Sequence, residues 1–120
     1  MKGNPMKYSL FFYHQNGTEA GLTEEDMAPW RAAFNAYTDA LKEAGAFVSM
    51  DVLQPPETAT TISLKEGSLQ VQDGPYADTK EYLGGYYVIE VPDLDAALAW
   101  AEKCPAAQWG YIEIRPSGLG

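Results

Sequence analysis

Hydrophobic and polar residues follow two different periods along this chain, and the switches between them predict its elements. Residues 7–14 read Lys-Tyr-Ser-Leu-Phe-Phe-Tyr-His. This aromatic-rich run predicts a central strand that is buried on both faces. Residues 46–53, 84–91 and 109–115 alternate from one position to the next, which predicts three further strands.

Two other segments place apolar residues three and four positions apart, the period of an amphipathic helix. The first carries such a stripe over residues 27–44. We expect a separate short turn at residues 23–26 before it, because Pro29 loses no hydrogen bond only in the first turn of a helix. Gly45 then ends this helix in a left-handed conformation. The second helix begins after Asp93, which is expected to be its N-cap.

A hairpin interrupts the order of these elements. Residues 58–65 and 68–72 are β-prone runs that flank Glu66-Gly67. Without the hairpin the order is β-α-β followed by β-α-β, the split βαβ or ferredoxin-like arrangement of an α+β domain. Both helices would then cover one face of the sheet.

The second face of this sheet is expected to be rich in aromatic residues. It would carry Phe47, Ser49, Asp51, Tyr86 or Tyr87, Trp109 and Tyr111. Such a surface is too apolar to remain in water as one large patch. We therefore expect two copies of the chain to pack these faces together as a homodimer.

The composition is that of one acidic domain with a real core. The chain has 120 residues, 46% of them hydrophobic, which predicts a single domain over residues 1–120 with flexible ends at 1–5 and 117–120. Its net charge is −9, from 17 acidic and 8 basic residues. Nucleic acids and anionic membranes attract basic surfaces, so we expect neither as a partner.

The single cysteine and the first residues indicate a cytoplasmic protein. Cys104 cannot form an internal disulfide, which fits a reducing compartment. It precedes Pro105 at an expected helix end, which favours a small buried residue over a nucleophile. No apolar run approaches the roughly 18 residues of a membrane span. Residues 1–6 lack the apolar stretch of a signal peptide.

Residues 73–81, the signature segment, read Asp-Gly-Pro-Tyr-Ala-Asp-Thr-Lys-Glu. The Asp-Gly-Pro start is turn chemistry, and ionisable residues follow it. A hairpin needs two or three turn residues, whereas this loop uses about ten. Long ordered loops inside compact domains tend to carry function.

The signature segment resembles the Asp-Gly-Pro-Phe-Ala-Glu-Thr-Lys-Glu motif of the DGPF family in the YCII-related superfamily, with Tyr76 and Asp78 as conservative departures. The resemblance runs from about Lys7 to Pro116. Its further motifs are Leu53-Gln54-Pro55-Pro56, Leu83-Gly84-Gly85-Tyr86-Tyr87, Pro92-Asp93-Leu94-Asp95-Ala96-Ala97-Leu98 and Glu113-Ile114-Arg115-Pro116. The resemblance implies a dimeric α/β barrel of ferredoxin-like protomers.

His14 and Asp73 are the candidate catalytic residues. His14 is the only histidine, and its unperturbed pKa near neutrality suits a general acid or base. The alternative is a strand-end histidine that is hydrogen-bonded to a loop. The resemblance implies a His–Asp pair in a cleft. Asp73 either presents its carboxylate to a pocket or accepts hydrogen bonds within its own turn.

Four residues are candidates for binding a substrate. Lys80 would bind an anionic group or orient Asp73. A short helical turn over residues 78–83 would bring Lys80 back towards the start of the loop. The alternative is that this loop is solvated and binds nothing. Aromatic rings at a cleft supply stacking area with a polar tip. The tyrosine candidates are Tyr76, Tyr86 and Tyr87.

No cofactor or metal is expected. One histidine and one cysteine cannot build a tetrahedral His/Cys site. The Gly84-Gly85 pair precedes a strand, whereas a phosphate-binding glycine loop precedes a helix. Two function classes remain open: a cofactor-free acid–base enzyme, such as an isomerase or lyase acting on a small organic molecule, and a non-catalytic ligand-sensing or partner-binding module. The resemblance associates the second class with sigma-factor regulation.

Overall fold

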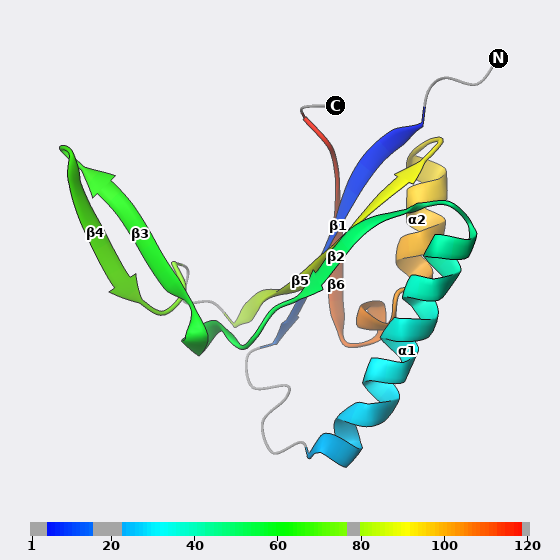
Figure 1. The fold of residues 1–120 in the computed structure, drawn as a ribbon, viewed down its shortest axis with the longest axis horizontal. Helices are drawn as coiled ribbons and strands as arrows, with labels where there is room; N and C mark the ends of the chain where they lie inside the picture. The colour runs from blue at the N-terminus through cyan, green and yellow to red at the C-terminus, as the bar shows by residue number, and fades with distance from the viewer. Residues whose placement is uncertain (1–4, 16–22, 77–79, 119–120) are drawn as a thin grey trace.

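The computed structural model describes residues 5–15, 23–76 and 80–118, which form a four-stranded sheet, a separate two-stranded hairpin and two α-helices (Figure 1). The strands are β1 (Met6–Gln15), β2 (Phe47–Val52), β3 (Thr60–Lys65), β4 (Ser68–Asp73), β5 (Glu81–Val91) and β6 (Gly110–Pro116). The α-helices are α1 (Glu24–Glu43) and α2 (Leu94–Lys103), and the 3₁₀ turns are η1 (Pro56–Thr58) and η2 (Pro105–Gln108).

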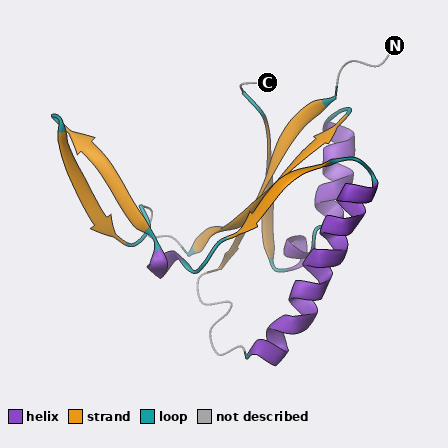
Figure 2. Ribbon diagram, viewed as in Figure 1, coloured by secondary structure: helices purple, strands orange, loops and turns teal. Residues whose placement is uncertain are grey.

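The sheet has the strand order β2-β5-β1-β6, and every pair in it is antiparallel. Both α-helices lie on one side of this sheet, and the β3–β4 hairpin lies on the other side (Figure 2). Without the hairpin, β1-α1-β2 and β5-α2-β6 are the two halves of a split βαβ unit. The predicted ferredoxin-like α+β fold with an inserted hairpin is therefore confirmed.

Alternate side chains of β1 form the centre of the core. Tyr8, Leu10 and Phe12 are buried on the helix side, where Phe34 and Leu41 of α1 pack in the same cluster. The intervening side chains of β1 are only half-buried. The prediction that this strand is buried on both faces is therefore wrong for the single chain.

Two buried tyrosine hydroxyls in this core have polar partners. The hydroxyl of Tyr37 donates to the carbonyl oxygen of Trp100 at 2.7 Å, which ties α1 to α2. The hydroxyl of Tyr87 pairs with Oγ1 of Thr38 at 2.8 Å, which ties β5 to α1. Burial raises the pKa of both phenols, so both remain protonated donors.

Helix α1 starts earlier than predicted and is continuous. Oγ1 of Thr23 accepts from the backbone N–H of Asp26 at 3.1 Å, and Oδ2 of Asp26 accepts from the N–H of Thr23 at 2.9 Å. This capping box places Pro29 inside the helix, where it cannot donate to the carbonyl of Glu25. Glu25 and Pro29 are both exposed, so water can donate a hydrogen bond to the carbonyl oxygen of Glu25. The separate turn expected at residues 23–26 is therefore wrong.

Glycines end α1 and form the tip of the hairpin as predicted. Gly45 has φ 73°, its N–H donates to Lys42, and the N–H of Ala46 donates to Leu41. These two bonds form a Schellman motif. At the hairpin tip, φ is 51° at Glu66 and 80° at Gly67, the geometry of a two-residue primed turn.

One irregularity in β2 changes the predicted faces of the sheet. The register shifts between Phe47 and Ser49, so Phe47 pairs with Ile89 and packs against the core on the helix side. Trp109 lies before β6, and its ring is 4.7 Å from that of Trp30. Both residues are therefore absent from the outer face, the side of the sheet without helices. The residues predicted there and found there are Ser49, Asp51, Tyr86 and Tyr111.

Helix α2 begins as predicted. Oδ1 of Asp93 accepts from the backbone N–H of Ala96 at 2.9 Å. The buried side of α2 consists of small residues, Ala97 and Ala101, whereas Leu98 is half-exposed. Over the described ranges of the chain, no helix is long and apolar enough to cross a membrane.

Cys104 is 2% exposed, and its burial raises the thiol pKa to about 11, above the ordinary value of 9.0. The unfolded chain releases this proton near pH 9, while the folded chain holds it to about pH 11. Above pH 9 the unfolded state therefore binds fewer protons. We expect the free energy of unfolding to fall by about 1.4 kcal/mol per pH unit between these values through this group.

Urea unfolding of the wild type and of Cys104→Ala at pH 8, 9 and 10 measures this contribution. The variant retains the titration of the buried tyrosines and loses that of the thiol. The difference in unfolding free energy between the two proteins should therefore change between pH 9 and 10. Parallel pH profiles would contradict a buried, protonated thiol.

Candidate functional site

A cavity of about 610 Å³ lies where the hairpin leaves the sheet, and we call it the junction cavity. Tyr13 of β1 lines it on the outer face. Pro75 and Tyr76 of the signature segment, and Tyr82 at the start of β5, form further parts of its wall. Six more lining residues come from the segment 53–59 that leads from β2 into the hairpin.

The root of the hairpin is held by short hydrogen bonds. The backbone N–H of Gly74 donates to the carbonyl of Ala59 at 2.7 Å, and Oγ1 of Thr61 donates to the carbonyl of Gly74 at 2.8 Å. Thr58 donates both its N–H and its hydroxyl to the carbonyl of Pro55. Gly74 has φ 98°, which favours glycine in the Asp-Gly-Pro turn. These bonds fix one wall of the junction cavity.

The signature segment is partly strand. Asp73 is the last residue of β4, pairs with Thr60, and exposes its side chain. Lys80 is also exposed. The helical turn expected over residues 78–83 is wrong at its end, because residues 81–83 belong to β5. Residues 77–79 of that expected turn lie outside the described residues.

His14 lies on the helix side of β1 and is 7% exposed. Its ring centroid is 4.4 Å from that of Tyr82, its partner in the register of β1 and β5. Tyr82 lines the junction cavity, so the imidazole lies directly behind one wall residue. The described lining includes neither His14 nor Asp73, and the pairing of these two residues stays a prediction.

The Gly84-Gly85 pair makes the placement of His14 possible. The register of β1 and β5 shifts between Phe12 and Tyr13, which leaves Gly84 as an extra residue on β5. A Cβ at Gly84 would overlap the imidazole of His14, and a Cβ at Gly85 would overlap the ring of Phe12. Glycine is therefore required at both positions by close approach of side chains from β1, and at Gly85 also by the backbone carbonyl oxygen of Asp51 on β2.

The predicted tyrosines have three different environments. Tyr76 is 89% exposed and stands at the wall of the junction cavity. Tyr86 is half-buried on the outer face of β5 and pairs with Phe11. Tyr87 is fully buried in the core. Tyr13 and Tyr82 line the junction cavity but were not among the predicted substrate-binding residues; the signal that brings them there is the pairing of β1 with β5.

A second cavity of about 500 Å³ lies between α1 and β2. Its walls include Trp30 and Arg31 of α1 and Met50 of β2. Leu53, Gln54 and Pro55 line both this cavity and the junction cavity, so this short segment separates them. The second cavity contains no residue of the signature segment among its described walls.

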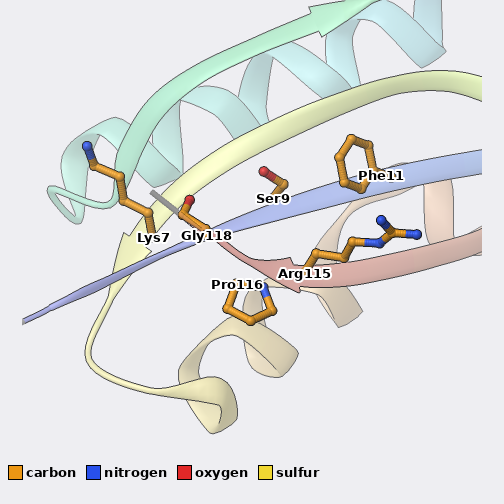
Figure 3. A pocket seen from close by; sticks show the side chains of 7 residues that line it. Lys7, Ser9, Phe11, Arg115, Pro116 and Gly118 are labelled. Carbon is orange, nitrogen blue, oxygen red and sulfur yellow. The ribbon is translucent and has the colours of Figure 1, made fainter. Parts of the chain in front are cut away.

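A shallow hollow of about 490 Å³ lies on the outer face between β1 and β6 (Figure 3). Ser9 and Phe11 rise from β1, and Arg115 extends beside them from β6. Nε of Arg115 is 2.6 Å from Oε2 of Glu113, and this hydrogen bond lowers the pKa of the Glu113 carboxyl. Burial, and then the hydrogen bond to Glu113, raises the pKa of Tyr13. The outer face is therefore aromatic with a paired charge at its edge.

The described residues do not bring three or more His, Cys, Asp or Glu side chains together in a way that could hold a metal ion. The polar side chains that line the junction cavity are instead those of three tyrosines, Gln54, Thr58 and Glu81. This set can stack on a planar molecule, accept hydrogen bonds and donate them.

Two comparisons with known proteins show the family of this chain. The family model of the YCII-related domain matches residues 6–117. An uncharacterized protein of Rhizobium meliloti (strain 1021) is 31% identical over 116 residues, which cover 95% of this chain and 94% of that protein. The similarity therefore extends over the sheet, both helices and the hairpin.

We expect Gly84→Ala to lower the free energy of unfolding by about 1–3 kcal/mol, because the added methyl group overlaps the imidazole of His14. Gly118→Ala is the control, since a Cβ there meets no atom within 4 Å. Urea denaturation measures both changes. The NMR signals of the His14 and Tyr82 rings should shift in Gly84→Ala alone. Equal stability of the two variants would contradict the close packing of His14 on β5.

Proposed function

This chain belongs to the YCII-related family, and we propose that it binds a small organic molecule in the junction cavity. The observation that carries this proposal is the convergence of Tyr13, Tyr76 and Tyr82, from three separate parts of the sequence, on one cavity. Its volume of about 610 Å³ is typical of small-molecule sites, which range from about 300 to 1,000 Å³. Phenol rings provide stacking area, and their hydroxyls orient the ligand.

The lining favours a planar ligand that is neutral or positively charged. Pro55, Pro56 and Pro75 add flat apolar surface beside the tyrosine rings. Glu81 supplies a carboxylate, and the whole chain carries a net charge of −9. An anionic ligand would meet repulsion from both sources. Lys80, which was predicted to bind an anionic group, is exposed and is not among the described lining residues.

The signature segment supports membership of the DGPF subfamily as part of this proposal. Pro75, Tyr76 and Glu81, which belong to its motif, line the junction cavity. Asp73 and Gly74 form the turn at the hairpin root that positions them. A motif that shapes one wall of a cavity is suited to ligand binding.

A cofactor-free acid–base reaction, of the isomerase or lyase type, is the finer form of the proposal. His14 would exchange a proton with the ligand, because imidazole is the one side chain of this chain that ordinarily titrates near neutrality. Its contact with Tyr82 places it next to the cavity wall. Asp73, at the hairpin root, would supply the carboxylate of the pair.

The second candidate function is ligand sensing without catalysis. The chain would then be a cytoplasmic module whose ligand binding changes its interaction with a partner, such as a sigma-factor system. The 7% exposure of His14 favours it, since a catalytic histidine must reach its substrate. The two candidates share the junction cavity and differ in whether His14 contacts the ligand.

We also propose that the chain is a homodimer. The outer face carries Phe11, Tyr13, Tyr86 and Val88 side by side, and Tyr111 is 67% exposed at its edge. Sheets of this kind are stable when a second layer covers them. Packing of two such faces would complete the barrel that the family resemblance implies.

A thermal-shift screen with planar aromatic fragments tests ligand binding. Hits should raise the melting temperature of the wild type, and Tyr76→Ala should weaken their affinity at least about tenfold by removing a stacking ring, worth about 1.5 kcal/mol. Leu98→Ala is the control, because it truncates a half-exposed side chain on α2, across the sheet. Equal loss in both variants, or no loss in either, would contradict the assignment of this cavity.

Substitution of His14 separates catalysis from sensing. With a bound fragment in hand, His14→Gln and Asp73→Asn should leave its affinity within about threefold, because each keeps the size and most hydrogen bonds of the side chain. In the enzyme, conversion of the ligand followed by NMR should fall at least about 100-fold in both variants. Wild-type protein that binds and never converts its ligand supports the sensor.

A further inference from the structure

The β3–β4 hairpin has one apolar face and one polar face. Cross-strand partners lie on the same face of a two-stranded ribbon. The apolar pairs are Ile62 with Val71 and Leu64 with Leu69. The polar pairs are Thr61 with Gln72, Ser63 with Gln70 and Lys65 with Ser68. The sixth pair, Thr60 with Asp73, is polar and lies at the root on the same face as the apolar pairs. Beyond the root the two faces are cleanly separated, which is the pattern of a ribbon that packs one side on an apolar surface.

The apolar face is open in the single chain. Its four aliphatic side chains are exposed by 64% at Ile62, 72% at Leu64, 57% at Leu69 and 61% at Val71. A two-stranded hairpin is marginally stable in water by itself. Four aliphatic side chains grouped on such a hairpin indicate a surface that another molecule covers.

The hairpin is held away from its own sheet. The hydrogen bonds of Gly74 to Ala59 and of Thr61 to Gly74 fix its root, and Pro55-Pro56 stiffens the connection to β2. Figure 1 shows the hairpin as a separate arm, well clear of the sheet. The radius of gyration is 16.6 Å, whereas a compact chain of this length has about 14 Å. Intramolecular folding therefore leaves the apolar face uncovered.

We propose that the β3–β4 hairpin is an arm that clasps a second copy of this chain seated on the outer face of the sheet. This inference rests on the proposed homodimer and adds the element that holds it together. A two-fold axis would let each copy cover the arm of the other.

The position of the arm fits this occupant. The helices cover one side of the sheet, and the arm projects on the opposite side, where the outer face is open (Figure 1). A second copy on the outer face would therefore lie between the sheet and the arm of the first. The two uncovered apolar surfaces of one chain would be covered by one partner.

The areas of the two surfaces also favour one shared interface. Four strands about 4.8 Å apart, with about seven paired residues of 3.3 Å each, give the outer face a footprint of about 450 Å². The same spacings give the hairpin face about 200 Å². A stable interface removes about 800 Å² from each partner, so the sheet face alone is small for a permanent dimer. The arm raises the combined footprint to about 650 Å², and the accessible surface of such corrugated faces exceeds their footprint.

The charge of the arm fits a partner that is acidic. The chain has a net charge of −9, so two copies repel each other at long range. Near its tip the hairpin carries one lysine, Lys65, and one glutamate, Glu66, which cancel, and Asp73 at its root gives the hairpin a net charge of −1. The tip of the arm therefore approaches an acidic surface without adding repulsion, and the one unbalanced negative charge lies at the root. A basic partner such as nucleic acid-binding protein would be attracted to other parts of this chain.

Sedimentation equilibrium of the full chain tests the proposal with a matched pair of variants. Leu64→Gln with Leu69→Gln changes the apolar face near the tip. Ser63→Gln with Ser68→Gln places the same residue on the polar face of the same hairpin. We expect the dimer dissociation constant to rise at least about 100-fold in the leucine variant, since four buried leucines per dimer are lost, and at most about threefold in the serine variant.

The possible results distinguish the proposal of a clasping arm from the proposal of a homodimer. A wild-type monomer at micromolar concentration overturns both the arm and the homodimer, whereas the ligand site is unaffected. A wild-type dimer whose dissociation constant is equal in all three proteins overturns the arm and leaves the homodimer. Far-UV circular dichroism of each variant verifies its fold.

A measurement on wild-type protein removes any dependence on folding of the variants. In a mixture of ¹³C-labelled and unlabelled chains, isotope-filtered NOEs should connect the Leu64 and Leu69 methyl groups with aromatic protons of the other copy. A dimer in which these methyl groups show only contacts within their own chain overturns the proposal. That result would indicate that the apolar face of the arm binds a different protein.

Discussion

The rest of the structure depends on the close approach of β1 side chains to the backbone of β5. His14 lies over Gly84 and Phe12 lies over Gly85, with no room for a Cβ at either glycine. The extra residue at Gly84 shifts the register, so Tyr82 faces His14 on the helix side while Tyr13 stays on the outer face. The register of the two central strands, the burial of the only histidine and the wall of the junction cavity therefore share one cause.

Local signals in the sequence predicted the elements and their order, because caps, turns and periodicity act over a few residues. Asp93 caps α2, Gly45 ends α1, and Gly67 turns the hairpin as expected. The start of α1 could not be assigned in this way. Pro29 favours a later helix start, whereas the capping box favours a start directly after Thr23. The helix starts directly after Thr23 because Pro29 lies on its exposed side, where water can replace the lost hydrogen bond.

Side-chain faces were harder to predict than elements, because one extra residue in a strand exchanges its two faces. A shift beside Phe47 moved that ring to the helix side, and a shift at Gly84 made Tyr82 the partner of His14. Tyr76, which was predicted from its motif, lines the junction cavity. Tyr13 was missed, because its place in the junction cavity depends on pairings between segments that are distant in sequence.

The junction cavity and the proposed arm are physically linked through the root of the hairpin. Tyr13 brings the outer face of the sheet to the cavity, and Ala59 and Gly74 bring the root of the arm to it. Because hydrogen bonds from Gly74 and Thr61 tie the root together, a ligand that moves Tyr76 or the segment around Pro55 would also tilt the arm. A partner held by the arm would in turn stabilise one shape of the cavity, since coupling between two sites is reciprocal. Ligand binding and the assembly of two copies would then be linked equilibria. A ligand sensor requires such coupling, whereas an acid–base enzyme does not.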